Sequence, residues 1–213
     1  AAATVANFNI SGGVAVTGAV LDSVSKRVVT LTTTTQVPGM LHTVTVSGVR
    51  DRTPQHHVIQ PQSVKTFTSR SLIDGSFEQN GQGWTSTGNS TVSNSSVPAT
   101  NGASVVVFNG LQTAPNGIVF QTISTVPGEQ YRLDFDMGIQ DFGTHSQSLE
   151  LTVQGDSLLL TRTETITGTG SGSTRWVGKS VEFTADSGTT TISFRDVSTI
   201  TSDVDLLLDD VRL

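Results

Sequence analysis

The sequence predicts an all-β fold made of antiparallel sandwiches, and three observations carry this prediction. Apolar and polar residues alternate in short runs, most clearly in residues 131–137, 149–153 and 192–194. Turn signals such as Pro127-Gly128 and Gly155-Asp156 separate these runs, and no segment shows helical periodicity. Because period-two alternation gives a strand one buried face and one wet face, the runs are expected to pair into layered sheets.

Composition narrows the class of protein. The chain has 213 residues, which is room for one or two domains, with 35% hydrophobic and 14% charged residues and a net charge of -6. Without a basic patch it is not expected to bind nucleic acid. The absence of cysteine excludes disulfides and thiolate metal sites. No apolar stretch is long enough to span a bilayer. The chain starts without Met or a leader, so we expect a processed piece of a longer secreted or surface protein.

The alternating runs fall into two modules, residues 1–70 and residues 71–213, with a boundary near Arg70-Ser71. In the first module we expect strands over residues 27–32, 42–47 and 64–68. The second module carries the clearer strands, since its alternation is longer and its turn signals are more frequent. Two successive β-sandwiches are therefore predicted.

Several stretches of the second module resemble a jelly-roll carbohydrate-binding module of the galactose-binding-like type. They are residues 72–78 followed by Gly83-Trp84, residues 120–136, residues 176–185 with 190–194, and the closing residues 206–213. The resemblance implies that residues 72–78 and 206–213 are the first and last strands and lie side by side. It also implies recognition of carbohydrate rather than chemistry.

The first module resembles the bacterial Ig-like repeats of large surface proteins, on residues 5–13 and 43–51. That family usually has another strand or two before the segment that matches residues 5–13. The resemblance therefore implies an incomplete Ig-like sandwich with an open edge. We expect the missing strand to come from upstream sequence or from a neighbouring chain by strand addition.

The jelly-roll resemblance also implies a structural calcium ion where the first and last strands meet. Glu78 matches the acidic residue of the family's first-strand motif. Asp209 shares its strand phase with Val211 and is expected to point inward, whereas Asp210 is expected to face water. An inward carboxylate needs a cation or hydrogen-bond donors. Calcium at Glu78 and Asp209, or backbone amides around Asp209, are the two alternatives.

Candidate ligand-binding residues are few, because only 6% of the residues are aromatic. Aromatic rings matter since the apolar faces of sugars stack on them. The candidates lie in a polar loop, at the start of a strand after a glycine-rich tract, and on an exposed strand face: Phe142, His145, Arg175, Trp176, Asp134 and Asp136. Asp134 and Asp136 could equally form a solvated face, and Phe142 could equally plug one end of the sandwich.

The sequence contains no nucleophile elbow, P-loop, dinucleotide fingerprint or HExxH motif, and its histidines form no triad pattern. We therefore expect no enzyme. The leading interpretation is an extracellular carbohydrate-binding module attached to an Ig-like spacer, with a polysaccharide or cell-surface glycan as its partner. The alternative is a structural stalk, adhesion or filament unit that assembles through strand edges. A third possibility is a module that accompanies a glycosidase domain.

Overall fold

The computed structural model describes residues 4–34, 36, 40–51, 53–60, 62–69, 72–94, 97–110 and 115–213. These residues form strands, one short 3-10 turn, η1 (Val5–Asn7), and no α-helix, so the predicted all-β class is confirmed. The chain divides into two compact units, residues 1–69 and 70–213. No helix of the described residues is long and apolar enough to cross a membrane.

The first unit consists of two small antiparallel sheets. One has the order β1-β4-β5, from β1 (Phe8–Ile10), β4 (Leu41–Val46) and β5 (Ser63–Thr68); the other pairs β2 (Val16–Leu21) with β3 (Val29–Thr33). In the described part of this unit, Ile10 and Val14 are the buried apolar residues, and His42 is fully buried beside the Phe67 ring. Its Ig-like identity stays a prediction.

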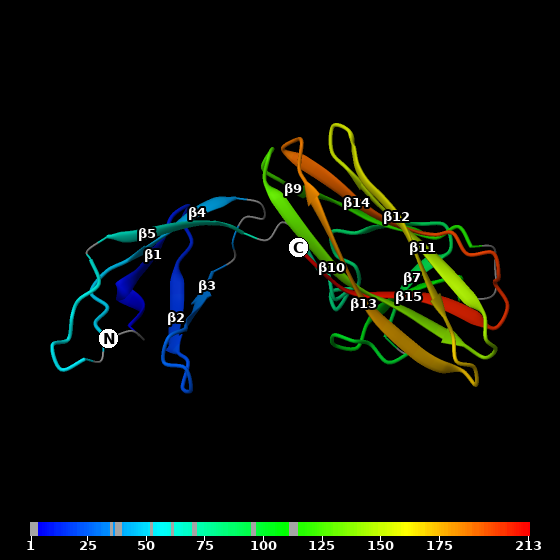
Figure 1. Cartoon of the computed structure of the whole chain (residues 1–213), viewed down its shortest axis with the longest axis horizontal. Coiled ribbons are helices and arrows are strands. Elements are labelled where there is room, and N and C mark those ends of the chain that lie inside the picture. The colour runs from blue at the N-terminus through cyan, green and yellow to red at the C-terminus, as the bar shows by residue number, and fades with distance from the viewer. Residues whose placement is uncertain are drawn as a thin grey trace. The chain divides into compact units, whose positions relative to one another are not determined.

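The second unit is a sandwich of two five-stranded sheets, drawn in green to red in Figure 1. The first sheet has the order β13-β10-β15-β8-β7, with bounds β13 (Ser173–Thr184), β10 (Gln130–Asp141), β15 (Val204–Arg212), β8 (Val105–Phe108) and β7 (Ser90–Ser93). The second has the order β12-β11-β14-β9-β6, with bounds β12 (Leu158–Thr167), β11 (Ser146–Gln154), β14 (Thr189–Asp196), β9 (Ile118–Ser124) and β6 (Thr85–Thr87). Neighbouring strands are antiparallel throughout.

The alternation seen in the sequence builds the core between the two sheets. Leu133, Phe135 and Met137 of β10 are at most 1% exposed and meet buried residues of β11 and β14 across the interior. Phe135 and Phe194 make an edge-to-face contact, with ring centroids 5.0 Å apart. The intervening residues of each strand lie on the two outer faces, which is where binding residues must be sought.

The opening segment of the second unit lies beside the last strand, as expected from the resemblance. The Val211 amide donates to the Gly75 carbonyl (2.8 Å), and a Cβ at Gly75 would lie 1.9 Å from the Val211 carbonyl oxygen. The expectation of a strand over residues 72–78 is wrong, however, because this segment is a series of turns. Asp74 (φ 47°) and Phe77 (φ 58°) have left-handed backbone, which breaks the extended geometry that a strand needs.

Charged side chains close one side of the sandwich, where the edge strands β12 and β13 meet. Glu164 and Arg162 of β12 share the inward phase of Leu149 and Leu151, and Lys179 of β13 shares that of Phe135. Glu164 forms ion pairs with Arg162 and with Lys179, the latter at 2.6 Å. The two sheets are therefore joined at this side by an ion-pair cluster in addition to apolar residues such as Ile166 and Val181.

Candidate functional site

The outer face of the β13-β10-β15-β8-β7 sheet gathers three of the residues predicted from sequence. Strand register places Asp134, Asp136 and Gly138 of β10 beside Ser180, Gly178 and Trp176 of β13, respectively. On its other side β10 places Asp136, Gly138 and Gln140 beside Asp209, Leu207 and Asp205 of β15. Since the alternate residues of β10 fill the core, all of these side chains start from the outer face.

Trp176 lies flat across β10 in the middle of this face. A Cβ at Gly138 would lie 2.5 Å from the indole ring, so only glycine lets the ring approach the strand so closely. The indole Nε1 donates to the Pro98 carbonyl (3.0 Å), and the ring packs, as Val97 and Ala99 do, against a small apolar cluster on this face. Trp176 is therefore half-buried, with one edge fixed by the segment 97–104.

The segment 97–104 covers the β15-β8 part of the same face. It lies over Val105, Val107 and Leu207, which form a small apolar cluster outside the main core. Two carboxylates hold this segment in place, and both were predicted as calcium ligands. Residues 97–104 thus form one boundary of the open part of the face, with Trp176 at the junction.

Asp209 binds the backbone of this segment. Its Oδ2 accepts hydrogen bonds from the Thr100 amide (2.7 Å), the Thr100 hydroxyl (3.0 Å) and the Asn101 amide (2.9 Å). Its Oδ1 accepts from the Asp210 amide (2.6 Å). Burial raises the pKa of Asp209, and the donors from Asn101 and Thr100 oppose that shift. The carboxylate is satisfied by donors, as in the second of the two alternatives drawn from sequence.

Glu78 plays a similar part at the other end of the segment. Its Oε1 accepts from the Ala103 amide (2.8 Å) and the Ser104 amide (2.5 Å), which lowers the pKa of Glu78. Amide hydrogens thus point at Glu78 Oε1 and Asp209 Oδ2, so these two oxygens already accept from the backbone. Among the described residues no group of three or more acidic or histidine side chains could hold a metal ion. Calcium at this position stays a prediction.

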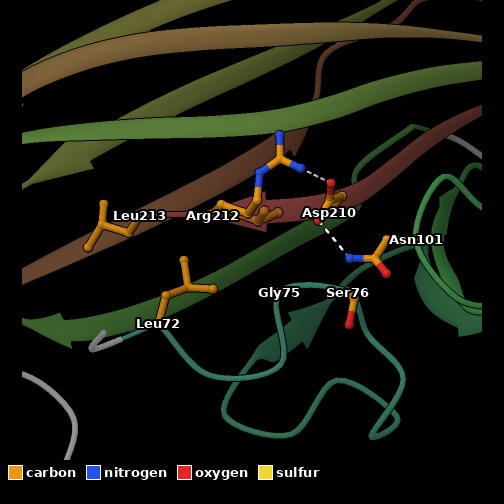
Figure 2. A pocket seen from close by; sticks show the side chains of 8 residues that line it. Leu72, Gly75, Ser76, Asn101, Asp210, Arg212 and Leu213 are labelled. Carbon is orange, nitrogen blue, oxygen red and sulfur yellow. Dashed lines mark hydrogen bonds and ion pairs between the residues drawn. The ribbon is translucent and has the colours of Figure 1, made fainter. Parts of the chain in front are cut away.

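The direction predicted for Asp209 is wrong. The register of β15 shifts between the partners Asp134 and Asp136, and Asp210 takes a left-handed conformation (φ 50°). This bulge places Asp209 on the outer face while Val211 returns to the core. Asp210, expected to face water, is only 8% exposed. It accepts from the Asn101 side chain (2.9 Å) and pairs with Arg212, as Figure 2 shows.

A cavity of about 200 Å³ lies between the opening segment and the end of β15 (Figure 2). Leu72 and Leu213 give it an apolar side, and Asp210, Arg212 and Asn101 give it a polar side. Because these three polar side chains already bind one another, the cavity offers few free groups to a ligand.

On the open part of the outer face, two carboxylates have no hydrogen-bond partner among the described residues. Asp136 adjoins Gly178, where no side chain covers it, and Asp205 adjoins Gln140. Burial raises the pKa of Asp205 to about 6. By contrast, Asp134 is held by Arg132 (3.0 Å), and hydrogen bonding to Ser180 and Arg132 lowers its pKa. Asp136 and Asp205 therefore lie on either side of the Trp176 position with free acceptor oxygens.

Phe142 and His145 lie at the end of β10, in the loop before β11. The His145 Nδ1 contacts the buried Asp141 Oδ1 (2.8 Å), which holds the imidazole in the loop. Phe142 is 66% exposed, so it does not plug the sandwich. Its ring lies across Gly172, where a Cβ would be 2.6 Å from the ring, and the Gly172 carbonyl accepts from Gln140 of the outer face (3.4 Å). Phe142 thus extends the face beyond Gln140.

Arg175 does not join this group. Its position pairs with Ile139, on the inward phase of β13, and its guanidinium donates to the Thr167 carbonyl of β12 (2.9 Å). Arg175 therefore bridges the two edge strands.

Sequence reasoning also missed Gln140 and Asp205, two polar residues of the outer face. The burial of Val204 and Leu206 on either side of Asp205 was readable as alternation and could have placed Asp205 on the outer face.

A family model for a carbohydrate binding domain, CBM_4_9, matches residues 69–198. The chain belongs to this family. The match covers most of the second unit, including β10 and β13 but not β15, and it confirms the resemblance drawn from the sequence of that unit. No curated protein matches the chain.

Solved structures similar to the chain include other β-sandwich modules. TmCBM61, solved in complex with beta-1,4-galactotriose, is 15% identical with a TM-score of 0.48, over 67% of this chain and 97% of that one. The K1 cleaved adhesin domain of Lys-gingipain from Porphyromonas gingivalis W83 is 20% identical with a TM-score of 0.47, over 61% and 88%. The C-terminal family 22 carbohydrate binding module of Clostridium thermocellum Xyn10B is 16% identical with a TM-score of 0.44, over 66% and 90%.

Proposed function

We propose that the CBM_4_9 unit binds an extended polysaccharide or cell-surface glycan along the open part of the β13-β10-β15-β8-β7 outer face, without cleaving it. One observation carries the proposal: Trp176 lies between two carboxylates, Asp136 and Asp205, that have free acceptor oxygens. A sugar ring can stack on the indole while its hydroxyls donate to the carboxylates on either side.

The shape of the face favours a chain over a single sugar. From Asp134 to Gln140 the strand covers roughly 20 Å at about 3.4 Å per residue. In addition to the half-buried Trp176, Phe142 provides an exposed ring beyond Gln140, linked to the face through Gly172. Two aromatic platforms with polar groups between them suit a linear ligand that runs along β10.

Binding without catalysis agrees with the state of the carboxylates. A glycosidase needs one carboxyl that keeps its proton and a second that stays ionised, both flanking the scissile bond. In the closely spaced pair Asp134 and Asp136, hydrogen bonds from Ser180 and Arg132 lower the pKa of Asp134, so Asp134 is not suited to be the carboxyl that keeps its proton. Residues 1–69 then serve as an Ig-like spacer, and the whole chain belongs to a secreted or cell-surface protein.

Affinity electrophoresis through gels that contain soluble polysaccharides, followed by titration calorimetry on the best ligand, tests the proposal. We expect retardation of the wild-type chain and little retardation of Trp176→Ala. Incubation with the same ligand should release no new reducing ends. A chain that binds no glycan on a broad array, or that cleaves its ligand, contradicts the proposal.

A second function is favoured by the first unit. Leu41 and Val64 are more than half exposed on neighbouring strands of the β1-β4-β5 sheet, and Val20 is as exposed on β2. β5 lies at an edge of its sheet in the described part of the chain. A stalk or filament that assembles by adding a strand to this edge is therefore the alternative. Concentration-dependent oligomers in sedimentation experiments, abolished by Val64→Lys, would support it.

A further inference from the structure

One end of the core holds three buried acceptor oxygens without a donor. Asn109 and Gln147 are fully buried, and Asp196 is 1% exposed. Asn109 Oδ1, Gln147 Oε1 and Asp196 Oδ2 each lack a hydrogen-bond partner within the described part of the chain. Buried polar atoms are nearly always satisfied, so three such atoms of one kind in one region require an explanation.

The three residues are tied to the same connection, residues 197–203 between β14 and β15. Asn109 follows β8 of one sheet and Gln147 lies on β11 of the other. Both side-chain amides nevertheless donate to the Ile200 carbonyl, at 3.4 Å and 2.8 Å. Asp196 ends β14, and its Oδ1 accepts from the Ser198 amide (2.9 Å). The connection thus brings groups from both sheets to one end of the core.

Backbone hydrogen bonds also indicate that Asp196 and Asn109 lie close together. The Asp196 amide donates to the Gly117 carbonyl (2.9 Å), and the Asn109 amide donates to the Asn89 carbonyl (3.1 Å). A Cβ at Gly117 would lie 2.4 Å from that Asn89 oxygen, so the two acceptor segments are in contact. Asp196 and Asn109 are therefore held by adjoining segments.

The orientation of the two amides is fixed by their partner. If either side-chain amide were turned over, its oxygen would face the Ile200 carbonyl oxygen. The Asn109 side chain is held further by its Nδ2, which also donates to the Val204 carbonyl (3.2 Å). Two acceptors cannot satisfy one another. Oxygens, rather than nitrogens, are thus the unsatisfied atoms at both positions.

One of the three oxygens belongs to a carboxyl group, which needs a neutralising partner if it is to be buried in its ionised form. Burial raises the pKa of Asp196, and none of the ion pairs among the described residues includes it. A proton on Asp196 would supply one donor, which leaves an amide oxygen unsatisfied. One water molecule would supply two donors and would not balance the charge. A cation can satisfy all three oxygens and neutralise the carboxylate.

We propose that Asn109 Oδ1, Gln147 Oε1 and Asp196 Oδ2 bind a hard cation, calcium in the first instance, at the end of the core closed by residues 197–203. The all-oxygen donor set, with one carboxylate and two amides, suits calcium rather than a softer metal. This site is separate from Glu78 and Asp209, whose oxygens accept backbone amide hydrogens. Its single carboxylate places the affinity in the weak range of extracellular modules, a Kd of about 10⁻⁴–10⁻³ M.

Thermal unfolding and calorimetry of the full 213-residue chain, after treatment with a chelator, test the site. Addition of about 10 mM CaCl₂, roughly ten times the weakest affinity expected, should raise the Tm by about 3 °C. Choline chloride of equal ionic strength should not do so. Sodium chloride serves as a second probe, and a rise in sodium that depends on Asp196 supports the same site with a monovalent ion.

Isosteric variants locate the ion. Asp196→Asn should abolish the rise in Tm, whereas Glu78→Gln and Asp209→Asn should keep it. Gln147→Glu should act in the opposite direction, with a lower Tm in chelator and a larger rise in calcium. The proposal is overturned if the wild type shows no rise in either salt, if the rise survives in Asp196→Asn, or if only Glu78→Gln and Asp209→Asn lose it.

Discussion

The two outer faces of the sandwich are both polar, yet they use their polar groups differently. On the β12-β11-β14-β9-β6 face, hydroxyls bind one another, as in Thr122 with Thr191 (2.8 Å) and Ser148 with Thr165 (2.9 Å), and Glu150 lies 3.9 Å from Arg195. On the opposite face, Asp136 and Asp205 have no such partner among the described residues. Carboxylates that have no partner among the described residues, rather than polarity, distinguish the proposed binding face.

The aromatic residues give the strongest test of this difference. Trp176→Ala should lower affinity for polysaccharide by roughly 30-fold, because a central stacked aromatic contributes about 2 kcal/mol. Phe120, half-buried on the opposite outer face beside Thr85 and Ser193, is the matched control. Calorimetry should show that Phe120→Ala binds as the wild type does. Equal losses in both variants would remove the distinction between the faces.

Asp136→Asn should have the next largest effect. It keeps the shape of the side chain and replaces a charged acceptor by a neutral one, so we expect about a tenfold loss of affinity, equivalent to about 1.4 kcal/mol. Glu150→Gln on the opposite face is its control and should change nothing. Melting temperatures measured in parallel separate a loss of binding from a loss of folding. An unchanged affinity in Asp136→Asn would contradict the assigned role of this carboxylate.

Asp205 makes binding depend on pH. Its folded pKa is raised to about 6, so it is protonated in mild acid and ionised above that value. We expect affinity to rise about fivefold between pH ~5 and ~7, because a charged acceptor binds hydroxyls more strongly than a neutral one. Folding stability should change in the opposite direction. Because the folded pKa of Asp205 is raised, the contribution of Asp205 to stability is largest below about pH 4 and is lost as the carboxyl ionises, through about pH 6.

The variant Asp205→Asn isolates this contribution. It should flatten the rise in affinity between pH ~5 and ~7. It should also remove the loss of stability that ionisation of Asp205 causes as the pH rises. Binding isotherms and thermal unfolding over the same buffers measure both. A pH profile of binding that persists in Asp205→Asn would show that another group is responsible.

The smallest effect on polysaccharide affinity is expected from a substitution on the β12-β11-β14-β9-β6 face. Thr163→Ala removes an exposed hydroxyl of β12 and should leave polysaccharide affinity within about twofold of the wild type, with a change in the free energy of unfolding of about 0.5 kcal/mol at most. A loss as large as that of Asp136→Asn, measured in the same affinity gels, would transfer the binding site to this face.

Much of the sandwich could be predicted from the sequence, because alternation along a strand fixes which residues are buried. Phe135 and Met137 enter the core, and Asp134 and Asp136 lie on the outer face, as the alternation implied; that Trp176 lies on the same face follows from the register of β10 and β13. These predictions needed only local information. The family model bears out the carbohydrate-binding resemblance of the same unit.

The remaining features depend on contacts that a sequence pattern does not contain. One residue in left-handed conformation, Asp210, shifts the phase of β15 and moves Asp209 to the outer face. The segment that Asp209 then binds is more than 100 positions away along the chain, at Thr100 and Asn101. The orphaned oxygens of Asn109 and Gln147 likewise become visible only when both sheets are assembled around the Ile200 carbonyl.

The ion-pair cluster of Arg162, Glu164 and Lys179 bears on aggregation. β12 and β13 are long strands at the edges of their sheets, and such edges invite pairing with other molecules. A strand of another molecule that paired with β12 or β13 would remove these inward-pointing charges from water. The cost of that desolvation disfavours edge-to-edge aggregation. At this side of the sandwich, the charges therefore oppose edge-to-edge pairing of one copy with another, including the close packing of copies that binding to a shared polysaccharide would bring about.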